Sequence, residues 1–174
     1  AGSYDEMAFQ ARRLRQGVYG QRQADVHMIR VKLPFGGVTP AQLDALGEVA
    51  ETFVPLRKGH ITTRQNIQYH HVPLSKATEV LKVLGSVGLS TREACGNTVR
   101  NVTGDPFAGV CQNELFDPTP YAGALARYWL RNPLSQAMPR KFKVAFTATD
   151  ADEAITGIHD IGFIPRIENG VRGF

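Results

Sequence analysis

Apolar and polar residues alternate between Val26 and Leu33, and this period of two predicts a β-strand. Its two faces carry Ile29, Val31 and Leu33 on one side and Met28, Arg30 and Lys32 on the other. Pro34 ends the strand, and Gly36-Gly37 turns the chain. The first predicted element is therefore a strand with one apolar face.

The spacing of apolar residues changes to that of a helix after this turn. Thr39 is placed as an N-cap and Pro40 as a first-turn residue, where proline is favoured. A buried stripe at helical spacing follows, consisting of Leu43, Leu46, Val49, Ala50 and Phe53. Because Pro55 closes this pattern, we expect a helix that begins at Pro40 and ends at Pro55.

Two further strands and a second helix complete this part of the chain. Residues 59–72 predict a strand with an irregular start, and Ser75 is placed to cap a helix that ends at Gly85 or Gly88. Residues 98–102 predict a third, short strand. The resulting β-α-β-α-β order is typical of an α+β, ferredoxin-like sheet with helices on one face.

The rest of the chain has a different pattern. Residues 103–120 are rich in Gly, Asp, Asn and Pro, which predicts a long functional loop, and a helix follows over about 120–130. Residues 141–147 alternate strictly and predict a strand. Residues 158–167 predict another strand, and Asn169-Gly170 predicts a hairpin-type turn.

A row of polar side chains is predicted on one face of the second strand. Alternation separates Arg64, Asn66, Gln68 and His70 from Gln65, Ile67, Tyr69 and His71. The first set is a row of hydrogen-bonding groups headed by a permanent cation. A solvated sheet face is the more common explanation of such a row, although solvated faces usually carry Lys, Glu and Thr.

Three other groups of charged residues also have a common structural explanation. Lys141 and Lys143 are predicted about 7 Å apart on the same strand face. They form either a solvated face or an anion-binding site. Arg100 lies in a short polar strand, where a surface ion pair is the usual finding. We interpret His159-Asp160 as a turn or strand-edge pair, since no second His/Asp cluster accompanies it.

Composition limits the classes of function. The net charge is +4, yet no basic run suggests a nucleic-acid tail, and no stretch approaches the roughly 18 apolar residues of a membrane span. Residues 1–16 resemble a polar, solvated arm and lack the layout of a signal peptide, so we expect a cytoplasmic protein. The two cysteines, Cys95 and Cys111, are too few for a four-iron cluster.

Three motifs are similar to signatures of the sirohaem-dependent sulfite and nitrite reductase haemoprotein family. They are ITTRQNIQYHHV at 61–72, TREACGNTVRNVTGDPFAGV at 91–110 and MPRKFKVAF at 138–146. The resemblance implies that residues 1–89 form an N-terminal arm and a ferredoxin-like half-domain. It also implies that residues 90–174 begin a mixed α/β sirohaem-binding domain. The chain would then be the N-terminal part of a longer reductase.

The resemblance also implies roles for particular residues. Arg64, Arg100, Lys141 and Lys143 would surround the distal face of the iron and hold the anionic substrate. Weaker candidates for contacts with the carboxylate-rich sirohaem are Asn66, Gln68, His70, Arg92 and Arg140. The family's four cluster cysteines lie in the C-terminal half, so the [4Fe-4S] cluster would belong to the full-length protein. This chain alone is therefore expected to be inactive and to supply no metal ligand.

The substrate would be sulfite or nitrite, reduced with six electrons from a donor such as ferredoxin or a flavoprotein. Sulfite-reducing members resemble the PRKFK motif, whereas plant-type nitrite reductases commonly carry Asn at the position of Lys143, which favours sulfite. At Asp105 the plant-type pattern is closer, because it commonly has Gly-Asn-Pro where this chain has Gly-Asp-Pro. A non-catalytic, ferredoxin-like docking or assembly module is the alternative function.

Overall fold

The structure, a computed structural model, describes residues 5–174. It opens with helix α1, Glu6–Arg15, whose N-cap Asp5 accepts a hydrogen bond from the amide of Ala8 at 3.0 Å. The predicted polar arm over residues 1–16 is therefore helical in most of its length, and residues 1–4 lie outside the described part. None of the residues of α1 is buried, which agrees with a solvated segment.

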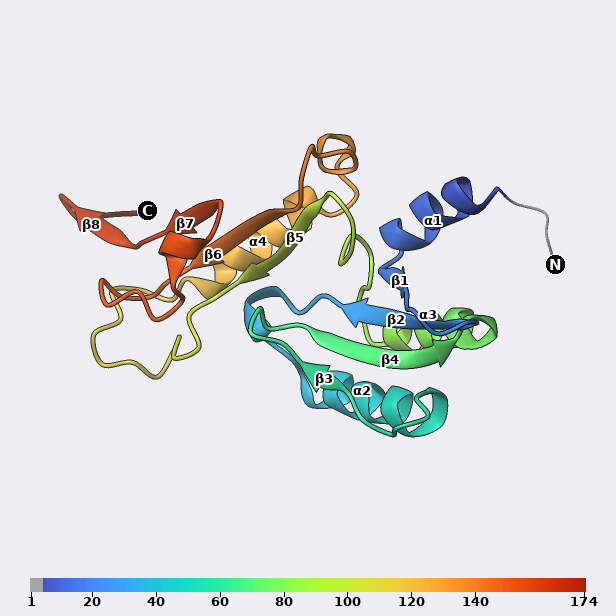
Figure 1. The fold of residues 1–174 in the computed structure, drawn as a ribbon. Helices are drawn as coiled ribbons and strands as arrows, with labels where there is room; N and C mark the ends of the chain where they lie inside the picture. The colour runs from blue at the N-terminus through green and yellow to red at the C-terminus, as the bar shows by residue number, and fades with distance from the viewer. Residues whose placement is uncertain (1–4) are drawn as a thin grey trace.

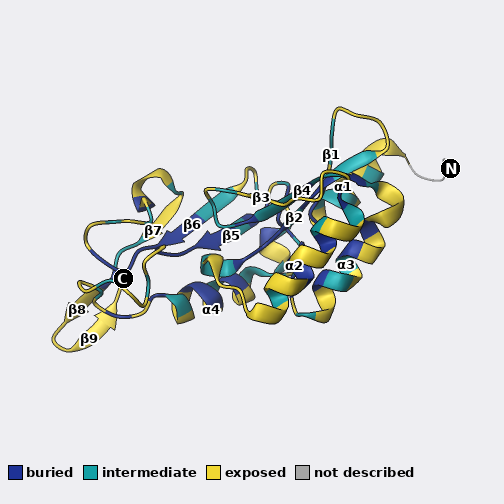
Figure 2. Ribbon diagram, turned by 90° about the horizontal axis from the view of Figure 1, so that it is seen from below, coloured by how far each residue is buried: buried dark blue, intermediate teal, exposed yellow. Residues whose placement is uncertain are grey.

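The first sheet is antiparallel, with the strand order β1-β2-β4-β3 (Figure 1). Its strands are β1 Val18–Gly20, β2 Val26–Val31, β3 His60–Ile61 and β4 Ile67–Pro73. Helices α2, Pro40–Phe53, and α3, Ala77–Ser86, pack beside each other on the sheet (Figure 2). The core between them is apolar and includes Ile29, Val31, Leu46, Val49, Tyr69, Val72, Val80 and Leu84.

The start of α2 confirms the predicted cap, and the start of α3 does not. The Thr39 hydroxyl accepts from Gln42 N at 3.2 Å, and the Gln42 side chain accepts from Thr39 N at 3.0 Å, which is a capping box. Ser75 instead lies within a short 3₁₀ turn, Leu74–Lys76, and no side-chain hydrogen bond caps α3. The preceding 3₁₀ turn supplies the entry to this helix.

The second sheet is parallel, with the order β5-β6-β7. Its strands are β5 Val99–Thr103, β6 Phe142–Phe146 and β7 Ile161–Phe163. Helix α4, Thr119–Trp129, provides the crossover that a parallel pair needs and packs on the sheet. This second core consists of Val102, Ala122, Ala126, Val144 and Phe146.

Short elements complete the chain. The other 3₁₀ turns are Pro34–Gly36, Pro133–Ser135 and Thr156–Ile158, and the last hairpin pairs β8, Arg166–Glu168, with β9, Val171–Gly173. Asn169 and Gly170 have φ values of 51° and 79°, which confirms the predicted hairpin turn. Within residues 5–174, no helix is long and apolar enough to cross a membrane.

Three predicted strands differ from the structure. Residues 59–72 form the hairpin β3–β4, because the chain reverses over 62–66 with Gln65 at a φ of 55°. Residues 98–102 pair with β6 and so belong to the second sheet, which corrects the predicted β-α-β-α-β order. Residues 158–167 divide into the end of a 3₁₀ turn, β7 and the start of β8, since Pro165 has no amide hydrogen for a ladder.

Candidate functional site

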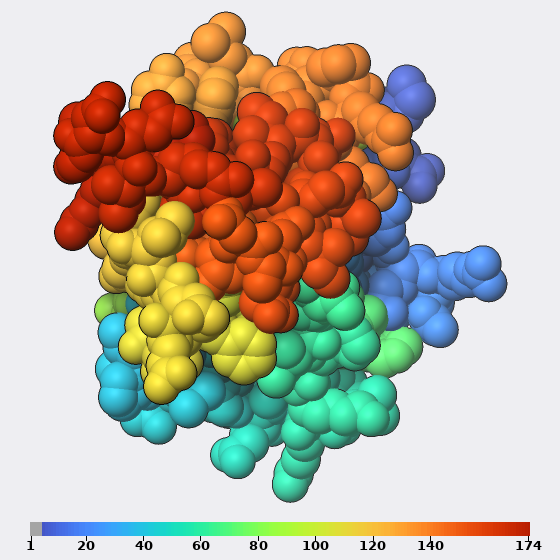
Figure 3. All heavy atoms as spheres, turned by 90° about the vertical axis from the view of Figure 1, so that its left-hand side faces the viewer, coloured from blue at the N-terminus to red at the C-terminus, as the bar shows by residue number. Residues whose placement is uncertain are grey.

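A basic pocket of about 270 Å³ lies where the two sheets meet. Its lining residues are Arg30, Thr62, Thr63, Arg64, Asn66, Gln68, Arg100, Lys141 and Lys143. They come from β2, the turn between β3 and β4, β4, β5, β6 and the residue just before β6, so both sheets contribute. Figure 3 shows the C-terminal part of the chain, in orange and red, resting against the N-terminal part, in blue and green. The pocket therefore exists only when the two parts are docked.

The turn that carries Arg64 docks on the second sheet through reciprocal hydrogen bonds. Arg64 Nη2 donates to Asn101 O at 2.5 Å, and Asn101 Nδ2 donates to Arg64 O at 3.1 Å. Gln65 Nε2 donates to Gly104 O at 2.8 Å, and Gly104 N donates to Gln65 Oε1 at the same distance. Asn101 is fully buried and also donates to Leu33 O at 2.7 Å. These contacts fix the direction of Arg64.

Arg100 and Arg30 are held by carbonyl groups of one loop. Arg100 Nε donates to Ala94 O at 3.0 Å, and its Nη1 donates to Gly96 O at 3.1 Å. Arg30 Nη1 donates to the same Ala94 O at 3.1 Å. Because one carbonyl accepts from both guanidinium groups, two like charges from β2 and β5 are kept close together. The position of the loop thus determines where both cations point.

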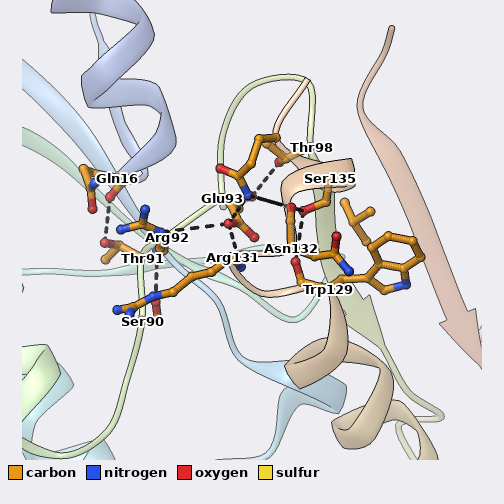
Figure 4. A network of polar contacts seen from close by, with 12 residues as sticks. Gln16, Ser90, Thr91, Arg92, Glu93, Thr98, Trp129, Arg131, Asn132 and Ser135 are labelled. Atoms are coloured by element: carbon orange, nitrogen blue, oxygen red, sulfur yellow. Dashed lines mark hydrogen bonds and ion pairs between the residues drawn. The ribbon is translucent and has the colours of Figure 1, made fainter. Parts of the chain in front are cut away.

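Glu93 holds that loop in place (Figure 4). Its side chain is fully buried, and Oε1 accepts from Arg131 N at 2.9 Å and from Gln136 Nε2 at 2.5 Å. Its backbone N donates to Arg15 O at 2.8 Å, and its carbonyl accepts from the Thr98 hydroxyl at 2.9 Å. One residue therefore links the loop to α1, to the segment after α4 and to the approach to β5.

Lys141 and Lys143 reach the pocket from the start of β6, the central strand of the second sheet. Lys143 is in β6 and Lys141 directly precedes it, and both line the pocket, as their predicted common face requires. The residues on the opposite face, Phe142, Val144 and Phe146, pack in the second core. Burial of that face is what turns the two lysines toward the first sheet.

The pocket contains five basic residues, and none of its described lining residues is acidic. Burial, and then the nearby Arg100, lower the pKa of Arg64 to about 10, against a smaller opposing effect of Asp160. Burial and the charge of Arg30 also lower the pKa of Arg100. The Nη1 atom of Arg64 and the Oδ1 atom of Asn66 are buried without a hydrogen-bond partner in the described structure. An oxyanion in the pocket would relieve the repulsion and pair with the free guanidinium nitrogen.

Six residues that we singled out from the sequence line this pocket, namely Arg64, Asn66, Gln68, Arg100, Lys141 and Lys143. Three others do not. His70 contacts Gln68 and lies 6.0 Å from the His60 ring, Arg140 is exposed, and Arg92 lines a second basic cavity beside α1. Their predicted contacts with a cofactor stay predictions. The row predicted from strand alternation is wrong at Arg64 and Asn66, which lie in a turn.

Arg30 is a pocket residue that the sequence reasoning missed. It lies opposite Gln68 in the β2–β4 register, and with the Gln68 amide oriented to satisfy both neighbours, Arg30 Nη2 donates to its oxygen at 2.9 Å. Alternation had placed Arg30 on the polar face of its strand. Only the strand register shows that the polar face of β2 lies beside the Gln68 face of β4, and the sequence alone does not give that register.

Lys32 directly follows β2 and is buried at the junction of the two sheets, so its titration should change the stability of the protein. Burial lowers its pKa to about 8 from 10.5, and Nζ donates to Val99 O at 3.3 Å. Between these pH values the unfolded chain binds more protons, so the free energy of unfolding should rise with pH. The slope should approach about 1.4 kcal/mol per pH unit.

Urea unfolding of the protein at pH values from about 7.5 to about 10.5 measures this slope. Lys32→Met should flatten the profile, because the depressed titration is removed. Lys82→Met, at an exposed position on α3, is the matched control and should leave the profile unchanged. Equal slopes in the wild type and Lys32→Met would contradict the assignment.

The metal-binding capacity of the chain is limited. Cys95 is buried, and burial raises the pKa of its thiol, while Cys111 is partly exposed. Among residues 5–174 there is no group of three His, Cys, Asp or Glu residues that could hold a metal ion. A [4Fe-4S] cluster needs four thiolates, so the residues present do not fit that cluster. The basic pocket, in contrast, suits a carboxylate-rich ligand or an oxyanion.

Comparisons with known proteins identify the family and agree with the fold. The family described as "Nitrite/Sulfite reductase ferredoxin-like half domain" matches residues 19–87, and "Nitrite and sulphite reductase 4Fe-4S domain" matches residues 95–174. The chain therefore belongs to the nitrite and sulfite reductase family, with an α+β fold that begins with a ferredoxin-like half-domain.

Among individual proteins, a sulfite reductase [ferredoxin] of Mycobacterium tuberculosis is 34% identical over 142 residues, covering 82% of this chain and 25% of that protein. The chloroplastic ferredoxin–nitrite reductase of Arabidopsis thaliana is 34% identical over 151 residues, covering 84% and 26%. The structure of the NirA protein of Mycobacterium tuberculosis superposes with a TM-score of 0.87 at 29% identity, covering 98% of this chain and 34% of that one. The chain thus spans about a quarter to a third of these proteins.

Proposed function

We propose that this chain is the N-terminal part of a sirohaem and [4Fe-4S] reductase that carries out the six-electron reduction of sulfite to sulfide. Nitrite, reduced to ammonia, is the alternative substrate. The observation that carries the proposal is the pocket itself, in which five basic residues from both sheets surround one space with no acidic lining residue. Such a pocket selects a small anion.

The basic residues have distinct parts in the proposed chemistry. Arg64 and Arg100 bind substrate oxygens, because guanidinium groups stay charged at neutral pH and bind oxyanions in a bidentate manner. Lys141 and Lys143 lie close to the same space and supply positive charge and protons as oxygen atoms leave. Fixed cations at this place favour the build-up of negative charge on the substrate during reduction.

The basic lining residues fit a carboxylate-rich macrocycle, because cations pair with its carboxylates. The partnerless Nη1 of Arg64 is a donor that a carboxylate of such a ligand or an oxygen of its substrate would satisfy. Asn66 and Gln68 are our first candidates for sirohaem contacts, followed by His70, Arg92 and Arg140. Sirohaem, with its linked cluster, supplies the electrons when bound. The cluster ligands belong to the part of the reductase beyond this chain.

The division of the chain and its partners follow from the same proposal. Residues 1–89 would be the arm and the ferredoxin-like half-domain, and residues 90–174 the start of the reductase domain. The electron donor would be a ferredoxin or a flavoprotein, since the similar reductases are named for ferredoxin. With most of the cofactor environment elsewhere, the isolated chain should not turn over, and a downstream CxxxxxC followed by CxxxC is expected.

Substitution of Lys143 tests the substrate assignment. In the full-length protein, Lys143→Asn should lower kcat/KM for sulfite by about tenfold and change that for nitrite less, because one proton-donating cation is removed. Steady-state rates with both anions measure the effect. Lys82→Asn is the matched control, because it removes an exposed lysine on α3 that does not line the pocket.

Comparison of the two substrates in the wild-type protein decides the main proposal. A kcat/KM for nitrite far above that for sulfite would reverse the substrate assignment. Absence of turnover with both anions, together with no visible sirohaem band in the full-length protein, would instead favour the non-catalytic docking or assembly module.

A further inference from the structure

Asp160 makes two hydrogen bonds to the backbone of one pocket residue. Its carboxylate Oδ2 accepts from Lys143 N at 2.7 Å, and its own backbone N donates to Lys143 O at 3.0 Å. Asp160 lies just before β7, at the edge of the second sheet, as the predicted strand-edge position requires. Both polar groups of the Lys143 peptide backbone are thus bound by a single residue.

The position of this contact in the sheet shows how it orders the start of β6. β5 pairs with β6 from Phe142 onward, whereas the β6–β7 ladder begins only at the pair Val144–Ile161, so Lys143 precedes that ladder. Without another partner on the side that faces β7, the start of β6 would open locally more easily, and the direction of the Lys143 side chain would be less well fixed. The Asp160 carboxylate takes the place of a further β7 residue and holds this side of β6 as far as Lys143.

Asp160 is itself exposed and lies among other charged groups of its segment. Its negative charge reaches Arg64, where it raises the pKa of the guanidinium against the larger opposing effects of burial and Arg100. His159 beside it donates Nδ1–H to Ile155 O at 2.9 Å, and burial together with Arg64 and Lys143 lowers its pKa.

The two nearest acids on the N-terminal side of Asp160 have other contacts. Asp152 accepts from the backbone and hydroxyl of Thr156, at 2.8 and 2.9 Å, and so holds the 3₁₀ turn. Glu153 lines a second cavity of about 430 Å³, which also contains Arg64, Lys143 and His159. Asp160 is therefore the acid of this segment that binds Lys143 directly.

We propose that Asp160 is a positioning residue, which holds the start of β6 so that the Lys143 side chain points into the anion pocket. The expected effect on turnover rests on the proposed function, whereas the expected effect on anion binding rests on the pocket alone. The hydrogen bond to Lys143 N carries the effect. An amide at position 160 can accept that bond, whereas a methyl group cannot.

Sulfite affinity of the sirohaem-loaded, full-length protein tests the proposal, followed through the visible spectrum. Asp160→Ala should weaken sulfite binding about tenfold and raise KM with it, since a misplaced cation no longer meets the anion. Asp160→Asn should stay within about twofold of the wild type, because its amide oxygen still accepts from Lys143. Asp150→Ala is the control, because Asp150 is an exposed acid of the same region that pairs with Arg166.

The outcomes separate the proposals. Wild-type affinity in Asp160→Ala, or an equal loss in Asp160→Asn and Asp160→Ala, would overturn the positioning role. If Asp160→Ala does not fold, Asp160→Leu removes the acceptor from a side chain of similar size and should show the same weakening. If the wild type binds sulfite but reduces neither anion, the proposed function fails, and the comparison of affinities still decides the role of Asp160.

Discussion

Replacing Arg64 with alanine in the full-length protein should lower kcat/KM for sulfite by about 10²–10³-fold, the usual effect of removing one preorganised donor from a charged site. Arg64 brings a permanent cation into the pocket, and its Nη1 is buried without a partner in the described structure. Steady-state kinetics should show a loss in kcat as well as in KM, because the interaction strengthens as negative charge develops.

Two further variants show whether charge or geometry is responsible. Arg64→Lys keeps a cation but loses the planar fork that also donates to Asn101 O, so we expect an intermediate loss. Lys82→Ala removes an exposed cation from α3 and should leave the rate unchanged. Sirohaem content per chain is measured in parallel, so that a loss of cofactor is distinguished from a loss of rate. A kcat/KM for Arg64→Ala within about twofold of the wild type would contradict the assignment of Arg64.

Asn101→Ala should lower the free energy of unfolding by about 3 kcal/mol, although Asn101 has no part in the chemistry. Its amide nitrogen donates to the carbonyl groups of Leu33, Arg64 and Gln65, at 2.7, 3.1 and 3.4 Å, and the side chain is fully buried. Alanine leaves those carbonyl groups without their donor and adds a small cavity. Urea unfolding of the protein measures the change.

The same substitution should weaken anion binding, because the turn that carries Arg64 is no longer held against β5. Asn97→Ala is the matched control, since Asn97 is exposed in the loop just before β5. Its effect should stay within about 0.5 kcal/mol. A stability loss for Asn101→Ala that equals the control would show that the docking contacts are not needed to hold the two sheets together.

Local signals in the sequence predicted much of the secondary structure. The Thr39 cap, the proline that follows it and the apolar stripe lie next to one another in the chain, and α2 begins and ends where they indicate. The Asn169-Gly170 turn is equally local, because positive φ values are accessible to these residue types. Alternation also showed that Lys141 and Lys143 share a face, because a strand with one buried face leaves little freedom of register.

Long-range pairing was not predictable in this way. The strand at residues 98–102 was expected in the first sheet, yet its partner is β6, which lies some forty positions further along the chain. The reversal at residues 62–66 was also missed, since Thr62-Thr63-Arg64-Gln65 contains no glycine or proline to mark a turn. Its geometry is stabilised instead by the contacts of Gln65 and Arg64 with β5.

The sequence by itself determined the family, through three ordered motifs, and identified Arg64, Arg100, Lys141 and Lys143 as the cations to consider. Only the tertiary structure decided that these four share one pocket with Arg30. It also placed Arg92, Arg140 and His70 outside that pocket and buried Lys32 at the junction. The physical reason is that side-chain type and local period are written in neighbouring residues, whereas the direction of a side chain depends on packing between segments far apart in the chain.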